Sequence, residues 1–189
     1  NAKVLSQYDC MTVGEAFGVN ANDAHLYVGQ ERNELNMIYH FDHAVPRDEH
    51  CFVNPKPEFS LVELKEIFNK WDKSLCGKGW NTVYFGNHDN PRMVSRFGDI
   101  ENYHQESAKM LATLLLTLPG TPFLYQGDEI GMTNNVFQTI DEFDDLQVVN
   151  AYQVLVNEQK HSSEDFMNAS NKIARDHART PMQWNAESN

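Results

Sequence analysis

Three short segments of this chain carry residue types that can act together on a substrate. A glutamate ends the segment Val13-Gly14-Glu15, a histidine–aspartate pair follows another apolar run at His88-Asp89, and Arg179 lies in a late motif. Carboxyl groups can exchange protons or stabilise positive charge, and histidine and arginine can donate hydrogen bonds to hydroxyl groups. Enzymes built on parallel strands collect such residues at the C-terminal strand ends. The pattern therefore predicts an active site at the C-terminal ends of a set of parallel strands.

Each carboxylate has two interpretations at this point. Glu15 has apolar neighbours such as Phe17, so desolvation could retain its proton, which suits a general acid. The alternative is an exposed or salt-bridged glutamate at a strand end. Asp89 could stabilise positive charge while His88 binds a hydroxyl group, or Asp89 could cap a loop around a structural histidine. The pair Asp128-Glu129 could bind hydroxyl groups, but a structural role is favoured.

The elements that must position these residues follow a regular alternation. Ser60 and Glu63 form a capping box that opens a helix, which apolar residues at steps of three and four extend to Leu75. A second helix is expected over 106–118, and a less regular helical region over 143–175. Four apolar runs predict strands, namely 10–13, 37–41, 82–85 and 122–125. Strands alternating with helices predict an α/β fold of parallel βα units, either half of an eightfold barrel or an open four-stranded sheet.

Composition narrows the classes of function. The 189 residues carry a net charge of −12, which disfavours nucleic-acid binding. The longest apolar stretch, 110–118, is too short to span a membrane. Cys10, Cys51 and Cys76 are odd in number and form no Cys-x-x-Cys motif, which favours thiols in a reducing compartment and a cytoplasmic location. The acidic segment 141–145 lacks the spacing of a calcium loop, so we expect a solvated face or a helix start and no metal site.

Aromatic side chains also occur near the polar strand ends, where sugar rings could stack on them. Most of them are expected to belong to the core. The residues concerned are Phe17, Tyr39, Phe41, Tyr84, Phe85 and Trp184.

Four longer motifs resemble glycoside hydrolase family 13, the α-amylase family. Residues 11–19 resemble the segment that holds the acid/base glutamate of this family, and residues 87–98 resemble the segment that holds its third carboxylate. Residues 120–134 and 178–184 resemble the oligo-1,6-glucosidase branch, which includes α-glucosidases, dextran glucosidase, trehalose-6-phosphate hydrolase and sucrose isomerases. The resemblance covers nearly the whole chain apart from 42–56.

The resemblance implies a (β/α)8 TIM barrel and a retaining hydrolysis of α-glucoside oligosaccharides without a cofactor. That mechanism uses an aspartate nucleophile, a glutamate acid/base and a second aspartate that stabilises the oxocarbenium-like state. By position, Glu15 is the acid/base and Asp89 is the stabiliser. The resemblance assigns substrate-binding roles to four further residues, namely His88, Arg179, Arg92 and Glu129.

The same resemblance implies that residues 1–189 form the C-terminal half of the catalytic barrel, with strands five to eight. The nucleophile, the N-terminal half barrel with any calcium site, the inserted small domain and the C-terminal β domain would all lie outside this chain. We therefore expect the isolated chain to be inactive on glycosides. Open sheet edges would also favour self-association.

Other functions remain open at this stage. Asn90-Pro91-Arg92 differs from the Gln-Pro-Arg of many members, and it favours dextran-glucosidase-like or isomerase-like enzymes. A trehalose-6-phosphate hydrolase is a further alternative within the branch. Some family members are non-catalytic binding subunits of transporters. The presence of Glu15, His88 and Asp89 together argues against that class.

Overall fold

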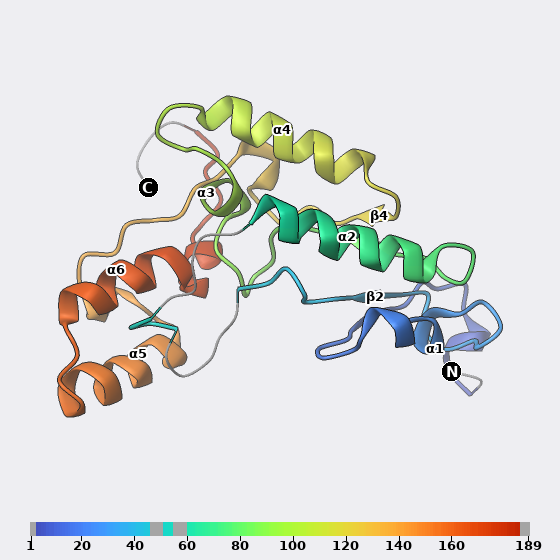
Figure 1. Ribbon diagram of the computed structural model, residues 1–189, viewed down its shortest axis with the longest axis horizontal. Helices are drawn as coiled ribbons and strands as arrows, with labels where there is room; N and C mark the ends of the chain where they lie inside the picture. Colours follow the sequence, from blue (N-terminus) through green and yellow to red (C-terminus); the bar gives the residue numbers. More distant parts are fainter. Residues whose placement is uncertain (1–2, 46–50, 55–59, 186–189) are drawn as a thin grey trace. The chain divides into compact units, whose positions relative to one another are not determined.

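The computed structural model describes residues 3–45, 51–54 and 60–185 (Figure 1). They form two compact units, each interrupted in sequence. The first unit comprises Asn1–Ala44, Ser60–Tyr84 and Leu115–Phe123. The second unit comprises Val45–Phe59, Phe85–Leu114 and Leu124–Asn189.

The four strands found among the described residues all belong to the first unit and are short. They are β1 (Val13–Glu15), β2 (Met37–Tyr39), β3 (Thr82–Val83) and β4 (Thr121–Pro122). β1 pairs with β2 and β3 pairs with β4, both in parallel. The Thr82 hydroxyl donates to the carbonyl of Ile38 at 2.8 Å, which links β2 to β3. Neighbours in space therefore follow chain order, as in a barrel wall, whereas a doubly wound sheet reverses its strand order.

All four predicted strands differ from the observed ones in their bounds. The strands expected over 37–41 and 82–85 end earlier, at Tyr39 and Val83. The first strand was expected over 10–13, but β1 begins at Val13. The carbonyl of Thr12 still accepts the amide of Met37 in β2, whereas the donors of Thr12 bond a side chain. Both its amide and its hydroxyl donate to Asn36 Oδ1, at 2.8 and 2.9 Å. The fourth strand was expected over 122–125, but β4 ends at Pro122 and only the amide of Phe123 continues the pairing.

The predicted capping-box helix is confirmed as α2 (Leu61–Leu75) in the first unit. The Ser60 hydroxyl accepts a hydrogen bond from the amide of Glu63, and the helix buries Leu64, Phe68, Trp71 and Leu75. Its inner face packs on a core that includes Ile38 of β2. Shorter elements of this unit are η1 (Leu5–Gln7), η2 (Ala21–Asp23) and α1 (His25–Val28).

The second unit contains the other helices and 3₁₀ turns. α4 (His104–Thr117), expected over 106–118, runs from this unit into the first. The region 143–175 is helical as predicted, but it divides into separate elements, with α5 and α6 side by side (Figure 1). The elements are α3 (Met93–Phe97), η3 (Asp128–Ile130), η4 (Ile140–Glu142), α5 (Leu146–Tyr152), the π-helical η5 (Gln153–Glu158), α6 (Ser163–Ile173) and η6 (Arg175–Arg179). Among the described residues, every helix is too short or too polar to cross a membrane.

A short segment between β2 and α2 completes the core of the second unit. Cys51 and Phe52 are buried there against side chains of α5 and α6. The Phe52 ring lies 5.4 Å from the ring of Phe166, in a stacked arrangement. A loop that the sequence left unexplained therefore contributes a hydrophobic anchor to the helical pair.

A buried histidine lies among aromatic rings in the first unit. His40 is 1% exposed and stacks on Trp71, with ring centroids 4.3 Å apart and an angle of 11° between the planes. Its ring nitrogens have no hydrogen-bond partner among the described residues. Burial lowers the pKa of His40 from 6.5 to about 4, against the opposing charge of Asp42. The folded chain therefore holds this ring neutral.

Replacing Phe52 by alanine should destabilise the second unit. The substitution removes a ring that is 2% exposed and leaves a cavity beside Phe166, so we expect the free energy of unfolding to fall by about 3–5 kcal/mol. Val136→Ala, at a side chain that is 67% exposed, is the control and should change it by less than about 0.5 kcal/mol. Chemical denaturation measures both values, and equal effects would contradict the anchor role.

His40 should make stability depend on pH in a defined direction. The pKa is lower in the folded than in the unfolded chain, so its contribution is complete above pH 6.5 and is lost as the pH falls through about 4. The difference amounts to on the order of 3 kcal/mol. Denaturation of the wild type and of His40→Phe across this range should show a steeper loss in the wild type. Parallel curves would refute the prediction.

Candidate active site

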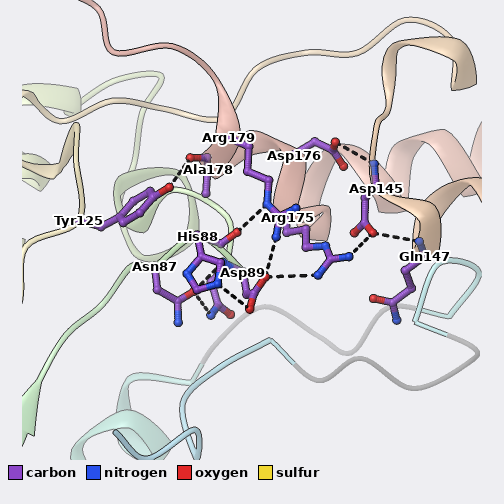
Figure 2. Close-up of polar contacts among 11 residues, drawn as sticks. Asn87, His88, Asp89, Tyr125, Asp145, Gln147, Arg175, Asp176, Ala178 and Arg179 are labelled. Atoms are coloured by element: carbon purple, nitrogen blue, oxygen red, sulfur yellow. Dashed lines mark hydrogen bonds and ion pairs between the residues drawn. The ribbon is translucent and has the colours of Figure 1, made fainter. Parts of the chain in front are cut away.

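The turn after β3 fixes the predicted histidine–aspartate pair. Asn87 Oδ1 accepts hydrogen bonds from the amide of Asp89 at 2.9 Å and from Asn90 Nδ2 at 2.8 Å (Figure 2). Asn90 Oδ1 in turn accepts from the amide of Val45 at 3.0 Å. An asparagine that bonds the backbone two residues on builds a tight turn. The turn presents His88 and Asp89 together at the C-terminal end of a strand.

The Asp89 carboxylate is surrounded by cationic groups but stays accessible. Arg179 Nη2 lies 2.9 Å and Arg175 Nη1 lies 3.3 Å from Asp89 Oδ1 (Figure 2). His88 Nε2 lies 3.2 Å from the other oxygen, Oδ2. The Asp89 side chain is 41% exposed. The two guanidinium groups and the imidazole therefore hold an accessible carboxyl group in place at this position.

Arg179 comes from a segment far along the chain and meets the turn at two points. Its Nε donates to the carbonyl of His88 at 3.0 Å, and its Nη2 bonds Asp89. The structure thus brings together three of the sequence-predicted site residues, His88, Asp89 and Arg179. Arg179 is half-exposed, so its remaining donors can reach a ligand.

Arg92 has a different environment from the one expected of a substrate-binding residue. It is 1% exposed, and its guanidinium group donates to the carbonyls of His177 and Gln126 and to the hydroxyl of Thr180. These contacts hold the backbone on both sides of Arg179. The structure therefore assigns to Arg92 a positioning role inside the fold, in place of the sugar contact that the sequence predicted.

The Asp128-Glu129 pair divides into a buried and an exposed carboxylate. Asp128 accepts a hydrogen bond from the amide of Tyr125 at 3.0 Å, and a Cβ on Gly86 would lie 3.3 Å from its Oδ1. Burial raises the pKa of Asp128 to about 6, although the Tyr125 amide opposes this. Glu129 is exposed and accepts from the amide of Gly127 at 2.8 Å. Asp128 is structural, and the substrate-binding role of Glu129 stays a prediction.

Glu15 belongs to the first unit, where it ends β1 beside two aromatic rings. Its side chain is exposed, so the desolvation expected from the sequence is not found in this structure. Phe17 is 85% exposed, and its ring lies 5.6 Å from that of Phe41 in a tilted arrangement. Such a pair offers apolar faces on which a sugar ring can pack. Tyr84 and Phe85, by contrast, are core residues.

Sequence analysis missed two further charged residues of the site, Arg175 and Asp145. Arg175 Nη2 lies 2.6 Å from Asp145 Oδ1, and the Asp145 side chain has no solvent exposure. Asp145 caps the N-terminus of α5, so the expected helix start is confirmed at this residue, and Asp141, Glu142 and Asp144 are exposed, as expected of a solvated face. The available signal was an aspartate directly before Leu146, the first residue of a helix.

The described residues do not assemble a metal-binding group of three or more histidine, cysteine or acidic side chains. Cys10 and Cys76 are free thiols at exposed positions, and Cys51 is buried. The side chains of the site offer an accessible carboxylate that can stabilise positive charge, and imidazole and guanidinium donors that can bind hydroxyl groups.

Comparison with known proteins identifies relatives across the whole chain. The family model "Alpha amylase, catalytic domain" matches residues 1–189. The chain is 48% identical to the oligo-1,6-glucosidase of Heyndrickxia coagulans, over 100% of this chain and 35% of that protein. It is 50% identical to the oligo-1,6-glucosidase of Bacillus cereus, over 97% of this chain and 33% of that protein. It thus spans about a third of the length of these relatives.

Solved structures agree with this assignment. The isomaltulose synthase of Klebsiella sp. LX3 superposes with a TM-score of 0.90 at 42% identity, covering 99% of this chain and 34% of that one. These relatives contain a (β/α)8 barrel, so the fold described above is part of a TIM barrel. The chain belongs to the α-amylase family, glycoside hydrolase family 13.

Proposed function

We propose that this chain is part of a retaining α-glucosidase that hydrolyses α-glucoside oligosaccharides, and that it supplies strands five to eight of the barrel. The observation that carries the proposal is the Asp89 carboxylate, held between Arg175, Arg179 and His88 at the end of β3 and still accessible. Relatives named oligo-1,6-glucosidase support the reaction class.

In this proposal two carboxyl groups of the chain carry chemistry. Glu15 protonates the leaving-group oxygen and later activates water, as the acid/base of a retaining enzyme does. Asp89 remains ionised and stabilises the positive charge that develops at the anomeric carbon. The nucleophile is a residue outside 1–189, and for this reason the proposal includes an inactive isolated chain.

The neighbouring groups bind the sugar. His88 and Arg179 donate hydrogen bonds to hydroxyl groups of the terminal glucose, and Glu129 acts near the next subsite. The Phe17–Phe41 pair packs against a sugar ring beside Glu15. No cofactor is required. The odd number of cysteines, without a Cys-x-x-Cys motif, supports the cytoplasmic location that we include in the proposal.

Sucrose isomerisation is a second candidate, favoured by the isomaltulose synthases among the structural relatives. The two activities differ in the fate of the glucosyl group. Hydrolysis of sucrose yields glucose and fructose, whereas isomerisation returns a disaccharide. Chromatography of the products formed from sucrose by the full-length enzyme separates the two candidates.

Replacing Asp89 by asparagine in the full-length enzyme tests the central observation. The amide has nearly the same shape but no charge, so it loses the stabilisation of the oxocarbenium-like state. We expect kcat on 4-nitrophenyl α-glucoside to fall by about 10³-fold, with a smaller change in KM. Asp141→Asn, at an exposed aspartate of η4, is the control. A variant Asp89→Asn with wild-type kcat would contradict the proposal.

Replacing Glu15 by glutamine should make the rate depend strongly on the leaving group. An alkyl glucoside such as isomaltose needs protonation, so we expect its kcat to fall by about 10²–10⁴-fold. The 4-nitrophenyl group leaves without a proton, so its glycosylation step should be affected much less. Single-turnover kinetics of both substrates measures the contrast, and Glu31→Gln is the exposed control. Equal losses on both substrates would rule out the acid role.

A further inference from the structure

A row of alternating charges runs inward from the proposed stabiliser. The Arg175 guanidinium group lies between two carboxylates: its Nη1 is 3.3 Å from Asp89 Oδ1, and its Nη2 is 2.6 Å from Asp145 Oδ1 (Figure 2). The three residues come from the turn after β3, the N-terminus of α5 and η6. One planar group thus connects an accessible carboxylate with a buried one.

The inner end of this row is fixed by several contacts. The Asp145 side chain is 0% exposed, and its Oδ1 also accepts the amide of Gln147 at 2.9 Å. Asp176 Oδ1 accepts hydrogen bonds from the backbone amides of Asp144 and Asp145, at 3.0 and 3.1 Å. These two bonds fix the backbone from which the Asp145 side chain extends. A buried charge without its partner is strongly unfavourable, so Arg175 stays at Asp145.

The outer end of the row is less constrained. Asp89 is 41% exposed, and Arg179, which bonds the same Oδ1, is 42% exposed. An ion pair between two such side chains fixes geometry weakly, because water screens it and both groups are flexible. Arg175 is 31% exposed, and its Nη2 is held by the buried Asp145 carboxylate. Because the guanidinium group is planar and rigid, its Nη1 then donates to Asp89 from a fixed direction.

We propose that Asp145 is a positioning residue of the active site, because it fixes the guanidinium group of Arg175, which in turn orients the Asp89 carboxylate. The inference rests on the proposed function for the role of Asp89. Asp145 itself does not touch the substrate. It affects the reaction only by fixing Arg175, which contacts both Asp145 and Asp89.

This arrangement predicts which kinetic constant changes. A misoriented Asp89 loses stabilisation of charge that exists only in the transition state. The binding of the neutral ground-state sugar depends on it much less. Loss of the anchor should therefore lower kcat and kcat/KM by similar factors and leave KM nearly unchanged.

The experiment uses the full-length enzyme with Asp145→Asn. Asparagine keeps the side-chain shape and is as good an N-cap as aspartate, but it removes the charge that anchors Arg175. We expect kcat on 4-nitrophenyl α-glucoside to fall about tenfold or more, with KM changed less than about threefold. Arg175→Lys should behave alike, since a lysine cannot bridge two carboxylates in a fixed geometry.

Two comparisons separate positioning from a general loss of structure. Ser162→Ala removes the N-cap of α6 in the same unit, where the hydroxyl bonds the amide of Asp165, and should lower Tm but not kcat. The double variant of Asp145 and Arg175 should lose no more than about twofold beyond the worse single variant, because both act through one contact. A kcat within about twofold of the wild type in Asp145→Asn, or multiplicative effects in the double variant, would overturn the inference.

Crystal structures of the wild type and of Asp145→Asn keep this test independent of the proposed function. A wild-type enzyme that cleaves no α-glucoside refutes the proposed function alone. The Asp89 carboxylate then still decides the inference: a rotated or displaced carboxylate in the variant supports it, and an unmoved carboxylate overturns it whatever the kinetics.

Discussion

The geometry of the site depends on one buried guanidinium group, that of Arg92. It bonds the carbonyls of His177 and Gln126 and the hydroxyl of Thr180, and so joins the segments that follow β3 and β4 to η6. Gly127 leaves room for it, since a Cβ there would lie 2.8 Å from Arg92 Nη1. Three loop segments share one donor group, so Arg92 helps to place η6, which carries Arg179.

The parts of the fold that local physics determines were predictable from the sequence. α2 begins at the N-cap Ser60, whose hydroxyl accepts the amide of Glu63, and it continues with apolar residues on one face. Both signals are local to the helix. Strand boundaries were less predictable, because a ladder depends on its neighbour. Thr12 lies in an apolar run, yet Asn36, 24 residues away, takes its amide and hydroxyl. No pattern within the strand encodes that competition.

The site shows the same division between local and distant information. His88, Asp89 and Arg179 were identified because each lies in a recognisable motif. Asp145 was expected to belong to a solvated face or a helix start, and nothing local reveals an arginine 30 residues further on. The sequence thus indicated the residues proposed to bind the substrate, and it did not indicate the ion pair of Asp145 that we propose positions them.

This asymmetry follows from the physics of charge in proteins. Placing a carboxylate at the surface costs little free energy, because water solvates the charge. A short sequence motif on a surface turn can therefore supply it. Screening by water and salt weakens its ion pairs, so they define its orientation poorly. A buried ion pair contributes little net stability compared with apolar residues of similar volume, and it can instead specify one geometry. Arg175 forms both kinds of ion pair with one side chain, an exposed pair with Asp89 and a buried pair with Asp145. In the proposed role, the buried Asp145 carboxylate orients the accessible Asp89 carboxylate through the guanidinium group that both of them contact.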